Sequence, residues 1–352
     1  MESLDFNLYK GNYKRLMIIP AILMVVFIIL IAAYPGIREG IDLKGGSQLL
    51  IQSSKSLDQK EVQTFVTQNF DLVDVRVATI SSPLGNSVRV EYASSTNLSN
   101  AQNLVSSAQA LLATDPTTAR ASALQALQLL GVSSKGTTAS EIVAESLDAL
   151  NSSQASQNDA IAKAIIQHFG LDSSTAYSST TISPVLGQLF SSGGPWIALV
   201  SFLLVLMVIF AFFRQIIPTL AIMFAAIFDV LTAAAAMTLF GIPLSLITIP
   251  ALLLIIGYSL DTDILLTTRV LKRKEGTARE RAFDSMKTGL TMSSTTLAAA
   301  AVMIPLSYFT QLDVMFDIAF LLFFGLIGDM ISTWLMNAPM LLWWVERKEV
   351  KP

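Results

Sequence analysis

The sequence predicts a helical membrane protein with six spans and one large soluble α+β domain inserted between the first and second spans. Hydrophobic residues make up 53% of the 352 residues and charged residues only 14%, which is too apolar for an ordinary soluble domain. Several apolar runs reach the roughly 20 residues that a helix needs to cross a bilayer. Between the first two runs, residues 36–194 are instead rich in Ser, Thr, Gln and Asn.

The first apolar run covers residues 16–34 and is predicted to be a retained span rather than a cleaved signal peptide. Its apolar part is longer than that of a typical signal peptide, and Ala32-Ala33-Tyr34-Pro35 is a poor cleavage site. We therefore expect residues 1–15 to precede a permanent membrane anchor.

The other five spans are predicted within residues 195–345. Breaks near Arg214 and Pro218 and at Gly241-Ile242-Pro243 divide the first apolar block of this region into three spans. Two more spans follow a charged segment, and the last is long enough to tilt or to project beyond the membrane. The five predicted spans are 196–213, 216–240, 244–268, 290–308 and 315–345.

The distribution of Lys and Arg predicts the orientation. Basic residues precede the first span, occupy position 214, crowd into a loop predicted at 269–289 and recur within 346–352, whereas the opposite short loops at 241–243 and 309–314 contain none. Because short cytoplasmic loops carry an excess of Lys and Arg, both termini are predicted to be cytoplasmic. Residues 35–194 are then extracytoplasmic, and the membrane is predicted to be the cytoplasmic (cell) membrane.

The extracytoplasmic domain is predicted to be ferredoxin-like, with an enlarged second helical element. Strand patterns occur at 48–52, 73–80, 87–92 and 176–182, with a turn signal at Pro83-Leu84-Gly85-Asn86. A helix capped by Ser56 is predicted over 57–70, and an alanine-rich helical pattern fills 100–169. The order is β-α-β-β-α-β with a helical insertion. The insertion is either a partner-binding face or a solvated helical hairpin.

Composition excludes several classes of function. The net charge of −3 gives no basic surface for nucleic acid, and no nucleic-acid motif is present. With no cysteine and one histidine, His168, a Cys-based nucleophile or a Cys or His metal site is not expected. No nucleotide-binding G-x-x-x-x-G-K-[ST] loop occurs. We expect no metal, no cofactor and no enzymatic activity.

Four aspartates fall inside the apolar runs: Asp229 in the third span, Asp261 and Asp263 in the fourth, and Asp329 in the sixth. Each costs about 2.5–3.5 kcal/mol on insertion scales if it is charged and unpaired, so each should face protein, another acid or water. A carboxyl in such a place is suited to bind and release a proton. The alternative is a carboxyl that stays protonated, or that hydrogen-bonds to Ser and Thr of the fifth span, and only orients helices.

Helical geometry separates the two acids of the fourth span. At a rise of about 1.5 Å per residue, Asp261 lies on the order of 12 Å from Arg269, toward the membrane centre. At about 100° per residue, positions 261 and 268 share a face while Asp263 points away from Asp261. One aspartate can therefore face a neighbouring subunit while the other faces this bundle.

The first span is followed by the segment Gly40-Ile41-Asp42-Leu43-Lys44-Gly45-Gly46. This segment resembles the G-x-D-x-x-G-G motif of the SecD and SecF family of protein-export membrane proteins, within the resistance-nodulation-division (RND) superfamily. Ile182–Gly187 resembles the segment that re-enters the membrane, and Gly257–Val270 resembles the fourth-span motif. The family also has small and hydroxyl residues at positions in the last two spans. In this chain these positions hold Ser293, Ser294, Thr295 and Thr296 in the fifth span, and Gly325–Gly328 and Ala338-Pro339 in the sixth.

Two departures from the common bacterial pattern stand in the fourth span. That pattern has Asn-Asp-Thr where this chain has Asp261-Thr262-Asp263, and an Asp immediately before the arginine where this chain has Thr268. The Asp-Thr-Asp form is similar to archaeal members. It also places an acid where the companion subunit of the family has one, so the division of charge between the two subunits is expected to differ.

The resemblance implies a fold, partners and candidate sites. The fold is a six-span RND-type half-bundle, and such a unit pairs with a second one, here a SecD-like subunit. The implied function is that of an accessory subunit of the Sec translocase, beside a SecY-type channel, acting on a translocating unfolded polypeptide in contact with membrane lipid. An ion gradient such as the proton motive force is a candidate energy source, and the ion-coupling candidates are Asp229, Asp261, Asp263, Arg269 and Asp329.

Three other functions are weighed against this one. A small-molecule or lipid exporter of the RND superfamily would usually be larger and have duplicated halves. An intramembrane aspartyl protease would carry Tyr-Asp, Gly-x-Gly-Asp and Pro-Ala-Leu signatures, where this chain has Phe228-Asp229, Ile327-Gly328-Asp329 and Ala338-Pro339-Met340. The third alternative is a purely structural stabiliser of a membrane complex. Only an experiment distinguishes this role from that of an accessory translocase subunit coupled to an ion gradient.

Overall fold

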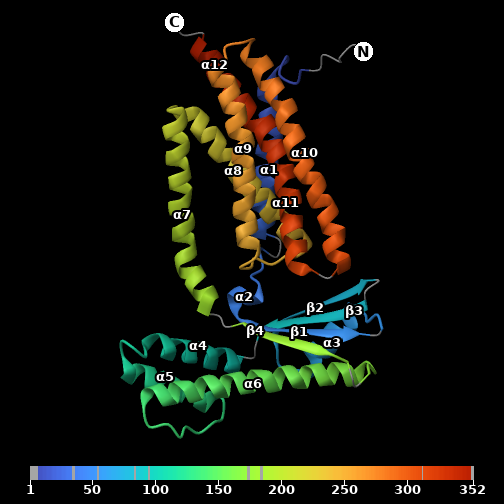
Figure 1. Ribbon diagram of the computed structural model, residues 1–352, viewed down its shortest axis with the longest axis vertical. Helices are drawn as coiled ribbons and strands as arrows, with labels where there is room; N and C mark the ends of the chain where they lie inside the picture. Colours follow the sequence, from blue (N-terminus) through green and yellow to red (C-terminus); the bar gives the residue numbers. More distant parts are fainter. Residues whose placement is uncertain are drawn as a thin grey trace. The chain divides into compact units, whose positions relative to one another are not determined.

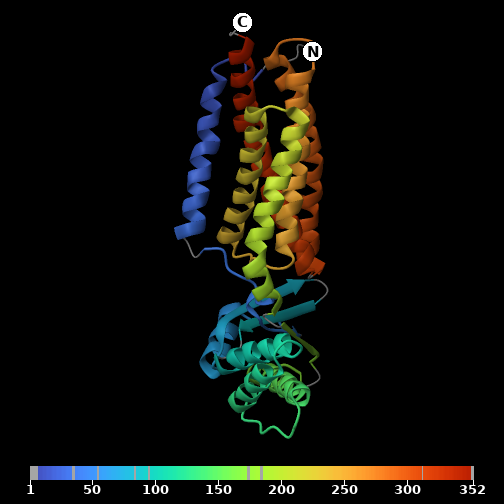
Figure 2. The same cartoon turned by 90° about the vertical axis from the view of Figure 1, so that its left-hand side faces the viewer.

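A computed structural model describes residues 7–33, 36–53, 55–82, 85–93, 96–172, 175–182, 185–310 and 312–349. Its chain divides into two compact units (Figures 1 and 2). One unit contains Met1–Arg38, Trp196–Tyr308 and Leu312–Pro352, and the other contains Glu39–Pro195 with Phe309–Gln311. Each unit has its own hydrophobic cores.

Six helices in the described residues are long and apolar enough to cross a membrane, which confirms the predicted number of apolar helices. The sixth helix is continuous but contains a π-helical segment, η2, that periodicity did not predict. The elements that contribute to this unit are η1 (Tyr13–Met17), α1 (Ile18–Ala33), α7 (Val185–Phe213, from Trp196 onward), α8 (Ile216–Phe240), α9 (Thr248–Lys272), α10 (Ala278–Thr310, as far as Tyr308), α11 (Asp313–Ser332), η2 (Thr333–Asn337) and α12 (Ala338–Glu349).

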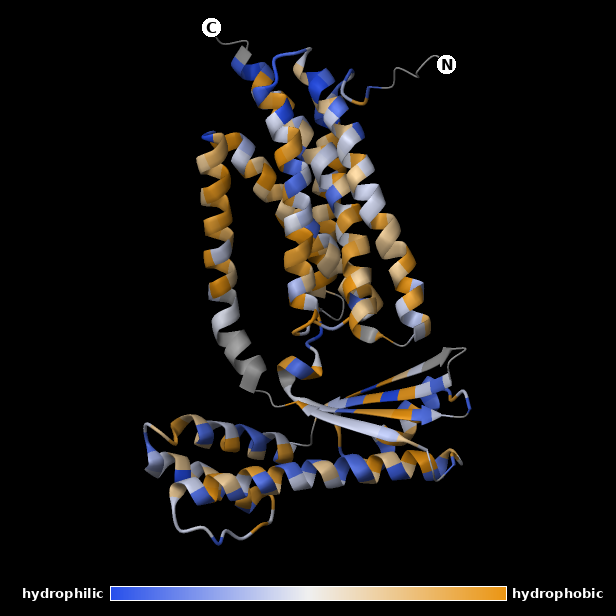
Figure 3. Ribbon diagram, viewed as in Figure 1, coloured by the Kyte–Doolittle hydropathy of each residue, from blue (hydrophilic) through white to orange (hydrophobic). Residues whose placement is uncertain are grey.

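Helix α8 is the most buried of the six, and it packs against α1, α9 and α11. Small side chains make this packing close: the run Ala233–Ala236 is buried, and an ideal Cβ at Gly328 of α11 would lie 2.8 Å from Cβ of Thr232. Helix α7 lies at an edge of the unit in Figure 1, and α1 lies at an edge in Figure 2. Both helices expose apolar side chains, and Figure 3 shows the apolar character of α7. Such faces suit contact with lipid.

The predicted basic loop at 269–289 is wrong in extent, because most of it is helical. Helix α9 continues to Lys272 and α10 begins at Ala278, so only residues 273–277 form a turn. The carboxylate of Glu280 accepts a hydrogen bond from the backbone N–H of Thr277 at 2.9 Å and so stabilises the start of α10. Charged residues are compatible with helix in water, so a helix can continue past its apolar part.

The fourth span begins at Thr248 rather than at residue 244. The hydroxyl of Ser245 accepts hydrogen bonds from the backbone N–H groups of Ile247 at 3.2 Å and Thr248 at 3.0 Å, which holds the turn before the helix. Residues 241–247 therefore form a longer connection than the sequence indicated.

The second unit contains a four-stranded antiparallel sheet in the order β2-β3-β1-β4, formed by β2 (Val73–Ser82), β3 (Gly85–Ala93), β1 (Gly46–Ser53) and β4 (Tyr177–Ile182). Leu49 of β1 lies opposite Val90 of β3, and both are fully buried. They share one core with side chains from α3 (Gln59–Asn69) and α6 (Ala139–His168). Pro83 and Leu84 of the predicted turn lie outside the described residues.

Two further helices, α4 (Thr96–Leu111) and α5 (Pro116–Leu129), pack with α6 as the helical part of this unit. Thr138 and Glu141 form a capping box at the start of α6. At the start of α3 the cap is Asp58, whose side chain accepts from Lys60 N and Glu61 N, so the predicted Ser56 cap is wrong. Asp58 precedes Gln59 directly, which places its carboxylate next to the free N–H groups of the first turn.

Candidate functional site

Three of the four intramembrane aspartates meet at one buried polar cluster, which we call the carboxyl cluster: Asp229 of α8, Asp263 of α9 and Asp329 of α11. None of the three is more than 1% exposed. Within the described part of the chain, no Lys, Arg or His forms a hydrogen bond or ion pair with any of them. Isolated buried charges are costly, and the described partners of these carboxyls are neutral groups.

Hydroxyl and amide groups surround the three carboxyls. Asp229 accepts from the hydroxyl of Ser332 at 2.7 Å and from the hydroxyl of Ser259. Asp329 accepts from the hydroxyl of Ser293 at 3.3 Å. Asp263 accepts from the side-chain amide of Asn337 at 2.6 Å. Four helices therefore contribute to the cluster.

The hydroxyl of Thr333 links two of the carboxyls. Its oxygen lies 2.9 Å from Oδ1 of Asp263 and 3.1 Å from Oδ1 of Asp329. A threonine hydroxyl has one hydrogen, so it can donate to only one of these oxygens. The second contact is a hydrogen bond only when that carboxyl carries a proton and donates to Thr333. The geometry thus accommodates a proton held between Asp263 and Asp329.

The π-helical segment η2 supplies two of these groups. Thr333 and Asn337 are its first and last residues, and both contact Asp263. The backbone carbonyl of Trp334, between them, accepts a hydrogen bond from the hydroxyl of Tyr9 at 3.0 Å. Short π-helical stretches inside α-helices frequently occur at functional sites. Here the segment connects the carboxyl cluster with the N-terminal segment of the chain.

Two buried oxygen atoms of the cluster have no hydrogen-bond partner among the described residues, Oδ2 of Asp263 and Oδ1 of Asn337, and neither has Oγ1 of Thr267, one helical turn beyond Asp263 on α9. Buried polar atoms are rarely left unpaired in folded proteins. A proton on Asp263 would turn its carboxyl from an acceptor into a donor. No group of three or more His, Cys, Asp or Glu suited to a metal ion occurs in the described residues.

Asp261 and Arg269 do not join the cluster. Asp261 is exposed on the outer face of α9, opposite the buried Asp263, as the helical spacing predicts. Arg269 instead donates to the hydroxyl of Thr288 at 2.8 Å and to the carbonyl of Asp284 at 3.2 Å. It connects α9 with α10 away from the carboxyls.

Of the four predicted hydroxyl positions in the fifth span, only Ser293 reaches the cluster. Ser294 is exposed, and the hydroxyls of Thr295 and Thr296 donate to the carbonyl of Met292 in their own helix. Sequence reasoning missed the groups that contact the carboxyls from other helices. A signal for some of them was present, because helical spacing from Asp329 places several polar residues near one face: Ser332, Thr333 and Asn337.

The predicted extracytoplasmic motif shapes the entry into β1. Gly40 precedes the short helix α2 (Ile41–Lys44), which includes Asp42, and Gly45 has a positive φ of 79°. At Gly46, an ideal Cβ would lie 2.5 Å from the carbonyl oxygen of Tyr92 on β3. This part of the motif is therefore required for backbone conformation and close strand packing.

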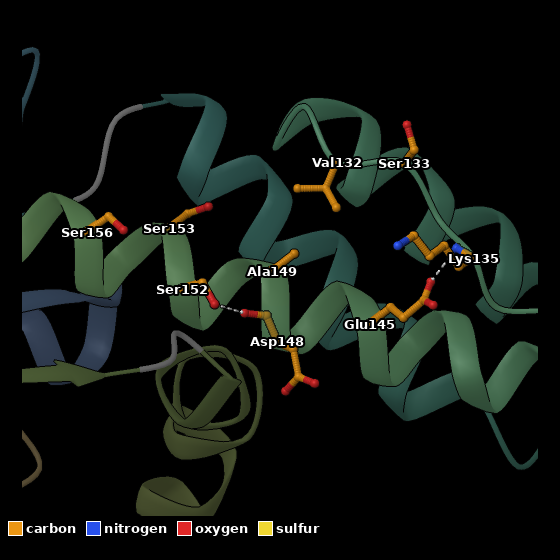
Figure 4. A pocket seen from close by; sticks show the side chains of 9 residues that line it. All are labelled: Val132, Ser133, Lys135, Glu145, Asp148, Ala149, Ser152, Ser153 and Ser156. Atoms are coloured by element: carbon orange, nitrogen blue, oxygen red, sulfur yellow. Dashed lines mark hydrogen bonds between the residues drawn. The ribbon is translucent and has the colours of Figure 1, made fainter.

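A cavity of about 740 Å³ lies beside α6 in the second unit (Figure 4). Two of its polar side chains have partners in this unit: Glu145 accepts from the hydroxyl of Ser134 and from Lys135 N, and Ser152 donates to the carbonyl of Asp148. The contacts of Glu145 hold the loop before α6, and the contact of Ser152 lies within α6 itself.

Comparison with known proteins gives consistent matches. Residues 161–347 match the family described as protein export membrane protein SecD/SecF, C-terminal. The protein-export membrane protein SecF of Methanothermobacter thermautotrophicus is 32% identical over 337 residues, covering 95% of this chain and 93% of that protein. The SecF of Pyrococcus furiosus is 43% identical over 173 residues, covering 49% of this chain and 57% of that protein.

A solved structure shares the fold. The crystal structure of SecDF, a translocon-associated membrane protein from Thermus thermophilus, superposes with a TM-score of 0.62 at 17% identity. The match covers 99% of this chain and 40% of the SecDF chain, so this chain spans well under half of that protein's length. A second SecDF structure, in a super-membrane-facing form, gives a TM-score of 0.55 at 17% identity and covers 98% of this chain and 39% of that chain.

Proposed function

The chain belongs to the SecD/SecF family of protein-export membrane proteins, and from this premise we propose how its parts act. It is an accessory subunit of the Sec protein translocase. The observation that carries this conclusion is 32% identity to a SecF protein over 95% of the chain. The family consists of protein-export subunits, which accords with the expectation that the chain is not an enzyme.

A SecD-like companion is the proposed partner within the membrane. Asp261 is exposed on α9, within a predominantly apolar span. A charged side chain at such a depth is costly in lipid, by about 2.5–3.5 kcal/mol on insertion scales. The solved SecDF chain is more than twice the length that this chain matches, which supports a second half-unit as the cover of this face. A SecY-type channel and an unfolded polypeptide complete the proposed assembly.

The second unit is proposed to be a ferredoxin-like domain outside the cytoplasmic membrane, where it contacts the emerging polypeptide. Its β-α-β-β-α-β order and its β2-β3-β1-β4 sheet support the assignment to this fold. The concentration of Lys and Arg in residues 1–15, 269–289 and 346–352 supports cytoplasmic termini.

The carboxyl cluster is proposed to bind and release the ion that powers export, with a proton as the favoured ion. Three buried acids without a described cation, and a single Thr333 hydrogen between two of them, support this proposal. Asp261, on the opposite face of α9, would respond to the companion subunit. A movement of α9 would then transmit a change at the carboxyl cluster to the face of the helix that carries Asp261.

The assembly is tested by purification from mild detergent and by secretion. Affinity-purified chain should retain a SecD-like protein and channel subunits, and deletion of the SecD-like gene should lower the abundance of this chain. A secreted reporter should accumulate inside cells depleted of this chain. Purification without companions, with unchanged abundance after the deletion, would instead identify an independent membrane protein.

A further inference from the structure

A basic pocket lies where the ends of α9 and α10 meet the N-terminal segment of the chain, away from the carboxyl cluster. Its volume is about 430 Å³. Five basic side chains line it together with three acids. The basic residues are Lys10, Arg269, Arg273, Arg281 and Lys287, and the acids are Glu275, Glu280 and Asp284.

Two of the three acids are already engaged by neighbouring groups. Glu280 accepts from the backbone N–H of Thr277 at the start of α10, and Asp284 lies 3.6 Å from the ammonium of Lys287. The surrounding segment 269–287 contains seven Lys or Arg and three acids, although the whole chain has a net charge of −3. Positive charge is therefore concentrated at this end of the helices.

Two of the arginines retain unused donors. Arg273 makes no hydrogen bond or ion pair with any residue that the structure describes. Arg281 donates one hydrogen bond, to the carbonyl of Gly276 at 2.9 Å, which leaves most of the N–H groups of its guanidinium without a described partner. Guanidinium groups present planar sets of N–H donors that match the oxygens of a phosphate. The pocket thus has both the charge and the donors for a phosphate group.

The depth of the pocket indicates where that phosphate comes from. Arg269 lies in the last turn of the apolar helix α9, and Lys287 lies just before the apolar part of α10 begins at Leu290. Both are at the level where a span leaves the hydrocarbon and where lipid headgroups lie. We propose that this pocket binds the phosphate headgroup of an anionic membrane lipid, with Arg273 and Arg281 as its ligands.

The proposal is tested on the purified full chain by native mass spectrometry in detergent. Phosphatidylglycerol and phosphatidylcholine with the same acyl chains are the two probes. We expect one phosphatidylglycerol to be retained in preference to phosphatidylcholine. Arg273→Gln should weaken its binding about fivefold or more, the effect of one basic residue near an anionic lipid surface. Arg273 has no described partner, so its loss should leave folding intact.

Lys274→Gln is the matched control, because Lys274 is the adjacent exposed cation, has no described partner and does not line the pocket. It should leave lipid binding unchanged. Arg281→Lys should retain more binding than Arg281→Gln at equal thermal stability. Equal losses in Arg273→Gln and Lys274→Gln, or equal binding of the two lipids, would overturn the proposal. Displacement of the lipid by millimolar inorganic phosphate would also overturn the proposal, because it would identify a soluble anion as the ligand. Lipid binding is measured on the purified chain, so its outcome does not depend on the proposed role in protein export.

Discussion

At the scale of single residues, the carboxyl cluster differs from an ion-pair network because its described partners are neutral. Thr333 contacts both Asp263 and Asp329. Asn337 contacts Asp263 with its side-chain N–H, and its own carbonyl oxygen has no partner in the part of the chain that the structure describes. A proton added to or removed from Asp263 changes which of these groups must donate. The hydrogen-bond pattern of η2 is thus expected to follow the protonation of the cluster.

Asp263→Asn tests whether the titratable proton matters. Asparagine keeps nearly the same size and one oxygen acceptor, but it cannot bind and release a proton. If Asp263 only orients helices, secretion should persist. We expect secretion of a reporter to fall to the level of cells lacking the chain, with normal membrane abundance. Wild-type secretion by Asp263→Asn would remove Asp263 from the ion pathway.

Asp261→Asn makes a separate prediction for the exposed acid. Because Asp261 has no described hydrogen-bond partner and is exposed, neither Asn nor Leu at this position should unfold the isolated chain. Both are expected to reduce secretion to a similar, severe extent while the companion still copurifies. Normal secretion by Asp261→Asn together with failure of Asp261→Leu would indicate a contact role without ion coupling.

At the scale of elements, close helix packing depends on particular glycines rather than on glycine content. Gly328 of α11 lies against Thr232 of α8, whereas an ideal Cβ at Gly257 of α9 would have nothing within 4 Å. The two positions look alike in sequence, since each is a glycine within an apolar span. Only the packing of neighbouring helices distinguishes them.

Gly328→Ala should therefore destabilise the chain and Gly257→Ala should not. Overpacking a close contact typically costs about 1–3 kcal/mol. Alanine is about 1 kcal/mol better than glycine in a helix interior, so the second variant should be neutral or slightly stabilised. Thermal unfolding midpoints in detergent provide the measurement. Equal midpoints for the two variants would contradict the described packing of α11 on α8.

The capping box of α6 predicts a pH dependence in the second unit. Hydrogen bonds from Thr138 and Thr137 lower the pKa of Glu141 from 4.5 to about 2. A pKa that is lower in the folded state stabilises the fold above pH 4.5, and this contribution is lost as the pH falls through about 2.

Wild-type chain and Glu141→Gln should therefore differ in the stability of α6 at neutral pH and converge at low pH. Amide exchange of the first turns of α6, measured after incubation at each pH, reports this difference. A difference that stays constant from pH 7 to pH 2 would show that the charge of Glu141 does not act as a cap.

At the scale of the whole molecule, segments from both ends of the chain meet within the helical unit. The hydroxyl of Tyr13 donates to Glu346 at 2.6 Å, and Arg279 of α10 pairs with the same carboxylate at 2.7 Å. Tyr9 is fully buried nearby and contacts Trp334. This network joins the N-terminal segment, α10 and α12, and it extends to η2 beside the carboxyl cluster.

The proposed topology is tested with single cysteines, which the absence of native cysteine makes straightforward. Ser152 and Thr277 are both exposed, so a thiol at either position is accessible in principle. In intact cells, an impermeant thiol reagent should label Ser152→Cys but not Thr277→Cys, and both should react after lysis. Labelling of Thr277→Cys alone in intact cells would invert the orientation.

The sequence alone determined the properties that depend on local composition. Apolar length predicted six membrane helices, alternation predicted the strands, and helical spacing placed Asp261 and Asp263 on opposite faces of one helix. These features follow from the repeat of the backbone and from transfer of side chains between water and lipid. The positions of acids inside apolar runs also followed directly from the sequence.

Only the tertiary structure decided which of those faces meet. It brought Asp263 together with Asp229 and Asp329 and left Asp261 outside, and it selected Ser293 from four consecutive hydroxyl residues. It also introduced the π-helical segment that presents Thr333 and Asn337. Periodicity defines the face of a helix but not its neighbour, because the neighbour is chosen by packing between segments far apart in the chain.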